Sequence, residues 1–217
     1  MILMIKKHLK TIIITSLITL VPMIVGIVLW NKLPAEIPTH FGLNNEPDSY
    51  GSKAFVVFGM PLLMLAMHIV CILATKVDPK MSNLSDKVFT MVLYIIPAVS
   101  LLMCGMIYPI ALGNEMRVGL IVILFMGLLF TVSGNYLPKC KPTYTVGIKL
   151  PWTLNDSENW TKTHALAGKI WFAGGLLIIA TAFFESPVIF FCITIIMVLT
   201  PTVYSYLLFK KKKDKAE

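Results

Sequence analysis

Six long apolar runs, separated by polar segments, dominate the pattern of the chain. A helix needs about 20 mostly apolar residues to cross the hydrocarbon core of a bilayer. The runs are continuous and do not alternate at every second position, which favours helices over strands. The pattern therefore predicts an all-α integral membrane protein, a six-helix transmembrane bundle. The expected spans are Thr11–Trp30, Ala54–Thr75, Val88–Leu112, Val118–Leu137, Gly168–Phe184 and Pro187–Phe209.

The first long polar segment, residues 31–53, contains three prolines, which argue against helix over most of its length. Asn44-Asn45 and Tyr50-Gly51 are turn signals within it. We expect this outer loop to form a compact, structured cap at one membrane surface.

The second long polar segment, residues 138–167, divides into two parts. Its first part is expected to be extended or turned, with Thr143–Leu150 as a strand-like piece that Pro151 ends. Asn155 or Asp156 can then cap a helix that runs unbroken into the fifth span.

Large and small side chains alternate along one face of that predicted helix. Small residues on such a face let a neighbouring helix approach closely, and Gly127 and Gly134 of the fourth span offer the matching surface. The face comprises Trp160, His164, Ala167, Gly168, Trp171 and Gly175.

Composition and charge support a membrane protein. The 217 residues are 57% hydrophobic and 14% charged, whereas soluble domains are about a quarter charged. With six spans, one side of the membrane carries 16 lysines and the other only Lys32, Lys53 and Arg117. Positive residues favour the cytoplasmic side, which predicts an N-in/C-in topology. Topology thus explains the net charge of +8, and no nucleic-acid partner is expected.

Candidate catalytic chemistry is sparse. The six runs hold no Asp or Glu, and the chain has no zinc-protease, nucleophile-elbow or P-loop motif. Asp156, Glu158 and His164 match no catalytic order, so we expect no enzyme, no catalytic residue, no metal and no cofactor.

Three histidines each allow two interpretations of their role. His164 is a ligand or partner contact, or a helix-packing residue. His40 joins Asp48 and Glu46 in a metal or peptide site, or is a solvated loop residue. His68 lies within the second run, where an ionisable side chain is a functional candidate, or it is a neutral imidazole with a backbone partner.

The two polar segments resemble the SdpI family of bacterial membrane proteins, and the resemblance extends over most of the chain. The outer loop resembles the uncharacterised N-terminal membrane domain often found in these proteins, through Leu33, Pro34, Pro38, His40, Phe41, Pro47, Asp48, Ser52 and Lys53. The inner loop resembles the SdpI domain itself. Its matching residues are Asn135, Tyr136, Leu137, Pro138, Lys139, Tyr144, Gly147, Ile148, Lys149, Pro151, Trp152, Thr153, Asn159, Trp160, Thr163, His164 and Gly168.

The resemblance implies a multi-pass protein of the bacterial cell membrane that gives immunity to a secreted, membrane-active peptide toxin. It also implies that a cytoplasmic repressor could be held at the inner loop. We divide the chain into an N-terminal membrane domain, residues 1–112, and an SdpI-like domain, residues 113–217, each with three spans. Membrane lipids, the toxin and the repressor are the expected partners. A small transporter or lipid-interacting protein is the alternative, with His68 as its intramembrane candidate.

Overall fold

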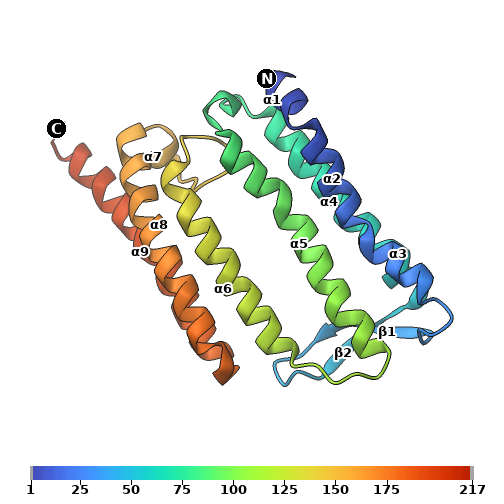
Figure 1. Ribbon diagram of the computed structural model, residues 1–217. Coiled ribbons are helices and arrows are strands. Elements are labelled where there is room, and N and C mark those ends of the chain that lie inside the picture. The colour runs from blue at the N-terminus through green and yellow to red at the C-terminus, as the bar shows by residue number, and fades with distance from the viewer. Residues whose placement is uncertain (1, 216–217) are drawn as a thin grey trace. The chain divides into compact units, whose positions relative to one another are not determined.

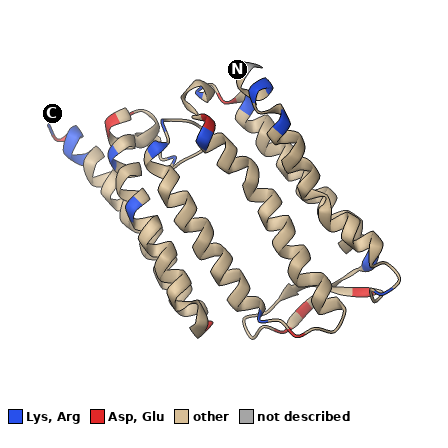
Figure 2. Ribbon diagram, in the orientation of Figure 1, with Lys and Arg blue, Asp and Glu red and all other residues tan. Residues whose placement is uncertain are grey.

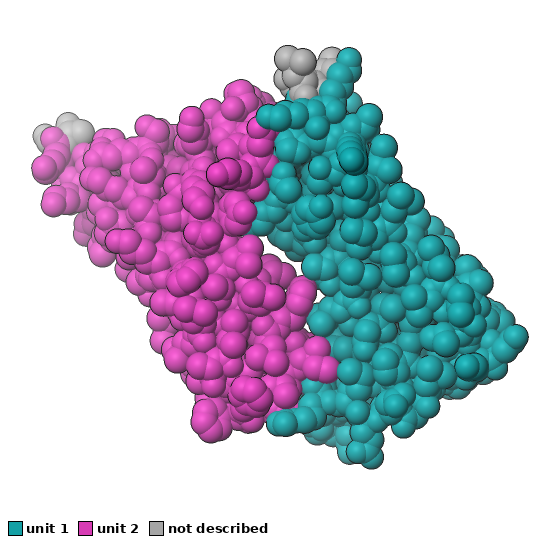
Figure 3. Space-filling model, viewed as in Figure 1, with its two compact units in different colours: residues 1–77, 89–118 teal, residues 78–88, 119–217 magenta. Residues whose placement is uncertain are grey.

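The computed structural model describes residues 2–215, which are mostly helical (Figure 1). The chain forms two compact units (Figure 3). Unit 1 comprises Met1–Val77 and Phe89–Val118, and unit 2 comprises Asp78–Val88 and Gly119–Glu217. One boundary thus falls in the first turn of helix α5 (Asp86–Ala111), and another at the start of helix α6 (Val118–Tyr136).

Unit 1 consists of helices that carry a β-hairpin at one end. Helix α1 (Ile2–Lys7) is followed by α2 (Leu9–Thr19) and α3 (Val21–Val28). Helices α2 and α3 form one apolar span interrupted at Leu20, two residues before Pro22, which has no N–H to donate to a helix. After the hairpin, the π-helical turn η1 (Phe55–Gly59) leads into α4 (Met60–Val77).

Residues 31–53 of unit 1, which we expected to form a structured loop, contain a β-hairpin. Strand β1 (Glu36–Phe41) pairs antiparallel with β2 (Pro47–Ser52). The connecting turn contains Asn45, whose φ of 64° is tolerated by asparagine. The turn predicted at Tyr50-Gly51 is wrong, because both residues lie within β2. The base of the hairpin packs through Leu33 and Ile37 against Val56, Val57, Ile107 and Tyr108.

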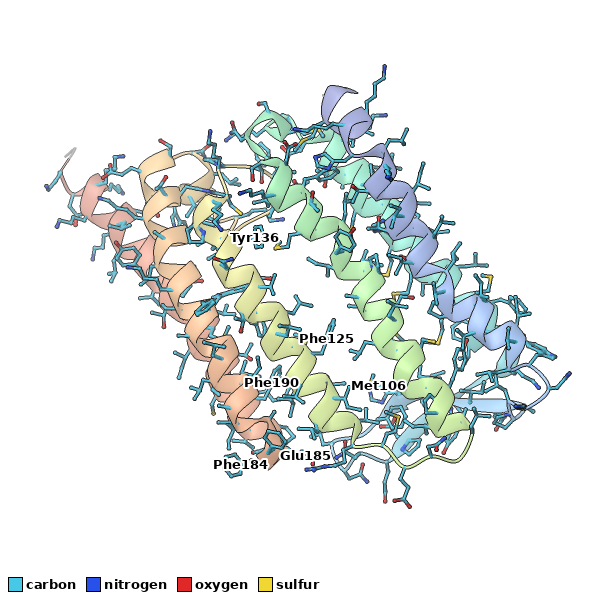
Figure 4. The ribbon with its side chains drawn as sticks, viewed as in Figure 1. Met106, Phe125, Tyr136, Phe184, Glu185 and Phe190 are labelled. Atoms are coloured by element: carbon cyan, nitrogen blue, oxygen red, sulfur yellow. The ribbon has the colours of Figure 1, made fainter. Side chains whose placement is uncertain are left out.

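Unit 2 contains three long helices: α6, α8 (Ser157–Thr181) and α9 (Pro187–Lys213). Short helical turns connect them: η3 (Leu137–Lys139) and α7 (Pro151–Leu154) between α6 and α8, and η4 (Ala182–Phe184) between α8 and α9. The unit also includes η2 (Met81–Asn83), which lies between α4 and α5 in the chain. Tyr136 lies at one end of this unit, and Phe184 and Glu185 at the opposite end, beside the turn between α8 and α9 (Figure 4). The polar segment that follows Tyr136 therefore begins at the end of the unit far from that turn.

Helices α6 and α8 approach closely at the predicted glycines. A Cβ atom built on Gly127 would lie 3.0 Å from the carbonyl oxygen of Gly175, and one on Gly134 would lie 2.9 Å from that of Gly168. Both separations are shorter than ordinary Cβ contacts. The expected small-residue surface between the fourth and fifth spans is thus confirmed.

Within residues 2–215, six helices are long and apolar enough to cross a membrane, as predicted: Leu9–Val28, Phe55–Val77, Asp86–Ala111, Val118–Lys139, Ser157–Phe184 and Pro187–Lys213. The fifth begins 11 residues before the predicted Gly168, because the capped helix runs unbroken into the span. The strand-like assignment of Thr143–Leu150 is wrong, and Pro151 begins helix α7 rather than ending a strand. A proline fits the first turn of a helix, where its missing N–H has no intrahelical partner.

Candidate functional site

The candidate site is the polar end of unit 2, residues 137–164, which we call the motif cap. Turn η3 and an irregular segment lead to α7, and α8 then begins after Asp156. The carboxylate of Asp156 accepts hydrogen bonds from the backbone N–H groups of Glu158 (3.0 Å) and Asn159 (3.1 Å). Of the two predicted capping residues, Asp156 is therefore the one that caps α8.

Trp160 forms the centre of the motif cap. Its side chain is fully buried, and its indole N–H donates to the carbonyl oxygen of Cys140 at 2.8 Å. The indole also stacks on the imidazole of His164, with ring centroids 4.1 Å apart. One residue of α8 thus holds the irregular loop against the helix by both a hydrogen bond and ring stacking.

His164 is buried, and both of its ring nitrogens are used within the cap. The backbone N–H of Ile148 lies 2.9 Å from Nε2, and because a backbone N–H can only donate, Nε2 is an acceptor. The proton therefore lies on Nδ1, which donates to the carbonyl oxygen of Trp160 at 2.8 Å. A neutral imidazole with both nitrogens engaged has no lone pair left for a metal, so the geometry favours the packing interpretation.

Gly147 is required where the loop crosses this ring pair. Its φ is +118°, a conformation that side chains with a Cβ atom rarely adopt. A Cβ atom there would also lie 2.6 Å from Nε2 of His164 and 2.7 Å from the Trp160 ring. Gly168 provides a second close approach, since its Cβ would lie 2.6 Å from Cδ of Pro138.

The hydroxyl of Thr153 closes the loop on itself. It lies 3.0 Å from the carbonyl oxygen of Ile148 and 2.9 Å from that of Leu150, and it accepts the backbone N–H of Leu150 at 2.9 Å. Because the side chain is fully buried, this hydroxyl provides the loop backbone with hydrogen bonds that water would otherwise provide.

A second buried network joins the motif cap to α9. The indole N–H of Trp152 donates to Oγ of Ser205 (2.9 Å), which donates to Oδ1 of Asn159 (2.8 Å). The hydroxyl of Thr163 donates to the same Oδ1 at 2.9 Å, and the amide of Asn159 donates to the Ser205 carbonyl at 2.9 Å. Ser205 was not predicted from the sequence. The feature that could have indicated it is a hydroxyl side chain in the last apolar run, close to the lysines that follow that run.

Sequence reasoning also missed Asp78, which follows α4. Its buried carboxylate accepts the backbone N–H groups of Tyr144 and Thr145 and the Thr145 hydroxyl, each at 2.9 Å on Oδ2. Nearby, Nζ of Lys80 donates to the Leu154 carbonyl at 3.0 Å, and the Asn83 amide donates to the Pro142 carbonyl at 2.8 Å. Residues 78–83, which are not part of the motif, therefore hold the loop between α6 and α8 in place through hydrogen bonds.

Several other motif residues are exposed at the surface of the cap. The Lys139 ammonium lies 5.0 Å from the Tyr136 ring, and that of Lys80 lies 5.1 Å from the Tyr144 ring. Lys149 donates to the Thr145 carbonyl at 3.3 Å. The exposed members are Asn135, Pro138, Lys139, Tyr144, Lys149 and Pro151, whereas Gly147 and Trp152 are half-buried.

Charged side chains flank the start of α8. Lys212 of α9 lies 2.8 Å from the Asp156 carboxylate, and Lys162 lies 2.7 Å from that of Glu158. The hydrogen bond from Lys212 is the main reason that the pKa of Asp156 is lowered from its ordinary value, and the two α8 N–H groups lower it further. Burial raises the pKa of the Cys140 thiol to about 11, which disfavours the reactive thiolate form.

The motif residues of the 31–53 segment lie on and beside the hairpin of unit 1. His40 and Asp48 form a hydrogen-bonded pair that is largely exposed, while Glu46 is bonded to Asn44 instead. Lys53 donates to the carbonyl oxygens of Trp30 (3.1 Å) and Leu33 (2.9 Å), and thereby fixes the base of the hairpin. Pro34 and Ser52 are exposed, Phe41 is half-buried and Pro38 is buried. Within residues 2–215, no three metal-ligating side chains converge.

His68 lies buried within unit 1, where α4 faces α2. Its Nε2 lies 3.0 Å from the hydroxyl of Thr15. The partner is thus a side chain rather than the backbone group that the packing interpretation proposed. Further along, the hydroxyl of Ser100 donates to the Thr19 carbonyl at 2.9 Å, and that of Tyr108 to the Pro22 carbonyl at 2.8 Å. These bonds tie the helices of unit 1 together.

Comparisons with known proteins match both polar segments. Residues 17–65 match a domain of unknown function, DUF1648, and residues 139–205 match the SdpI/YfhL protein family. The chain is 28% identical over 213 residues to "Immunity protein SdpI" of Bacillus subtilis (strain 168), which covers 95% of this chain and 97% of that protein. No solved structure matches. The resemblance to the SdpI family is confirmed, and the six apolar helices make the chain a multi-pass protein of the cell membrane.

Proposed function

We propose that this SdpI-family chain is a membrane immunity protein, which protects a bacterium against a secreted peptide toxin that attacks the membrane. The observation that carries the proposal is the similarity to an immunity protein over 95% of the chain. The family match supports it locally, because residues 139–205 include the Cys140 carbonyl, both tryptophans of the motif cap, His164 and Ser205. The segment that resembles the family is thus the segment that builds the cap.

The proposed role is binding rather than catalysis. In residues 2–215, each buried side-chain nitrogen or oxygen has a hydrogen-bond partner. A reactive centre usually keeps a nucleophile or base available for substrate. In the motif cap, His164 and Thr153 are instead engaged with the loop backbone, and the exposed residues remain for recognition.

The proposed topology is N-in/C-in, which places the motif cap in the cytoplasm and the hairpin outside. Within unit 2, lysines gather at the end that carries the motif cap and the end of α9 (Figure 2). This distribution follows the tendency of cytoplasmic segments to hold lysine. The N-terminal domain, residues 1–112, would then present the hairpin to the toxin, and the SdpI-like domain, residues 113–217, would present the motif cap to a cytoplasmic repressor.

Survival under toxin challenge tests the immunity function. A Gram-positive strain without its own immunity gene receives either this chain or an unrelated six-span membrane protein, and both proteins are quantified in the membrane. Exposure to the peptide toxin of an SdpI-protected strain should kill the control and spare cells that carry this chain. Equal killing at equal membrane abundance would contradict the proposal.

Co-purification tests the repressor role separately. Lys139→Gln with Lys149→Gln removes two exposed charges of the motif cap without touching its buried bonds, and Lys6→Gln with Lys10→Gln removes the same charge from exposed positions of unit 1. The proposal predicts that a cytoplasmic repressor purifies with the wild type and with the unit 1 variant, but less with the motif-cap variant. Equal recovery with all three would exclude docking through these lysines.

A further inference from the structure

We infer that a groove between α7 and the end of α9 binds the headgroup of an anionic phospholipid. This inference goes beyond immunity, and it does not depend on the toxin or on the repressor. It combines three observations within unit 2: a hollow of defined volume, a rigid aromatic floor and a rim of lysines.

The hollow has a volume of about 520 Å³. Pro151, Trp152 and Phe209 are its apolar lining residues and Lys212 and Lys213 its basic ones, and Asn155 and Asp156 complete the lining. A phospholipid fits this combination, because its first acyl carbons are apolar whereas its phosphate is anionic.

Stacking and a hydrogen bond fix the aromatic floor. The rings of Trp152 and Phe209 stack with centroids 5.8 Å apart and an angle of 26° between their planes. Tyr206 meets Trp152 edge-on at 5.7 Å. Because the indole N–H of Trp152 also donates to Ser205, its ring is held in one orientation where it lines the hollow.

Lysines exceed acids around the groove. The last turn of α9 contains four consecutive lysines, Lys210–Lys213. A second hollow of about 350 Å³ shares Asp156 and Lys212 with the first, and its other charged lining residues are Lys162, Lys211, Lys215 and Glu158. Asp156 would repel a phosphate, but its carboxylate already accepts from Lys212 and from two backbone N–H groups. The net field at the groove therefore attracts anions.

The surface of α9 favours a lipid over a protein as the occupant. Its apolar face is exposed along the helix, with Val203 at 53%, Tyr206 at 49% and Leu207 at 56% exposure. Since α9 is long and apolar enough to cross a membrane, acyl chains cover this face. The face ends at the groove, where Trp152 and the lysines lie at the level at which aromatic rings and ammonium groups meet lipid headgroups.

The test is lipid binding by the purified full chain. Native mass spectrometry counts bound lipid as phosphatidylglycerol or phosphatidylcholine is added to the protein in neutral detergent. The variants are Lys212→Gln with Lys213→Gln, and the control is Lys6→Gln with Lys10→Gln, which removes the same charge from unit 1. A lysine near an anionic surface changes lipid affinity by about fivefold. We therefore expect about a 25-fold loss of phosphatidylglycerol affinity in the groove variant and little change in the control.

Lys213→Gln alone keeps the Lys212–Asp156 pair intact, and it should lose about fivefold even if the double variant is unstable. Equal affinity of the wild type for the two lipids would overturn the inference, as would an unchanged affinity in the Lys213→Gln variant. Binding of a soluble cytoplasmic protein through these lysines, with no preference for phosphatidylglycerol, would identify the groove as a protein surface and would also overturn it.

Discussion

The backbone N–H of Ile148 donates a hydrogen bond to Nε2 of His164 across 2.9 Å. This contact joins the irregular loop to α8, and it fixes the imidazole as the neutral form with its proton on Nδ1. The histidine that the motif singles out is therefore an acceptor for the loop backbone. Its role is to hold the loop in one conformation, so that the exposed residues of the motif cap have fixed positions.

Replacing His164 with Phe should loosen the loop around Ile148. Phenylalanine can still stack on Trp160, but it offers no acceptor, and an unpaired buried N–H costs about 1–3 kcal/mol. Hydrogen exchange at the Ile148 amide should accelerate accordingly in the variant. His40→Phe, which changes an exposed histidine of unit 1, is the control and should leave that amide unchanged. Unchanged protection in His164→Phe would mean that this hydrogen bond does not hold the loop.

Gly147→Ala should destabilise unit 2 by about 2 kcal/mol or more, because the added methyl group meets two buried rings at a positive φ. Thermal unfolding of the purified protein measures the change. Gly105→Ala is the matched control, since a Cβ atom there meets nothing within 4 Å and alanine favours helix. The expected result is a lower midpoint only for Gly147→Ala. Equal midpoints would show that the loop can move away from Trp160 and His164 at little cost.

Asp78→Ala should release the loop around Tyr144 and Thr145. The substitution leaves two backbone N–H groups without their buried acceptor, and loss of hydrogen bonds to a charged group costs about 3 kcal/mol. Limited proteolysis should then cut within residues 140–150, where the wild type resists. Asp78→Asn keeps one acceptor oxygen and should show an intermediate rate. An Asp78→Ala protein as resistant as the wild type would exclude this carboxylate as a fastening point.

The Asp156–Lys212 pair predicts a dependence of stability on pH. The pKa of Asp156 is lowered in the folded state from its ordinary value of 3.8. A lowered pKa means that the ionised carboxylate stabilises the fold above the ordinary pKa, and that this contribution is lost as the pH falls through the folded value. Asp156→Asn removes the charge but can still cap α8. The wild type should be more stable than the variant at pH 7, and the difference should shrink below about pH 4. A difference that is the same at both pH values would refute an electrostatic origin.

The sequence predicted the six spans because apolar run length and the absence of period-2 alternation are local properties. It also predicted the contact between α6 and α8. Glycines at helical spacing indicate that a neighbouring helix can approach closely, and this holds for any partner helix. The loop between Thr143 and Leu150 was assigned as strand-like because its composition suits a strand. Its backbone bonds instead go to His164, Thr153 and Asp78, and no local pattern could reveal those partners.

The candidate site was predicted as a set of residues but not as an arrangement. Motif resemblance selected Trp160, His164 and Gly147 together, although it could not tell which members are buried. Asp78 and Ser205 lie 66 and 46 residues away in sequence from the groups they bond, so periodicity within the motif did not reach them. The structure thus separates residues that hold the motif cap from residues that can meet a partner.

Survival of cells that carry the Gly147 variant tests the central claim most directly: the folded motif cap is needed for immunity. The wild type, Gly105→Ala and Gly147→Ala are expressed in the strain without its own immunity gene, adjusted to equal membrane abundance, and challenged with increasing toxin. We expect the first two to protect equally and Gly147→Ala to protect weakly or not at all. Full protection by Gly147→Ala at that abundance would contradict the claim, since immunity would then not require the motif cap in this conformation.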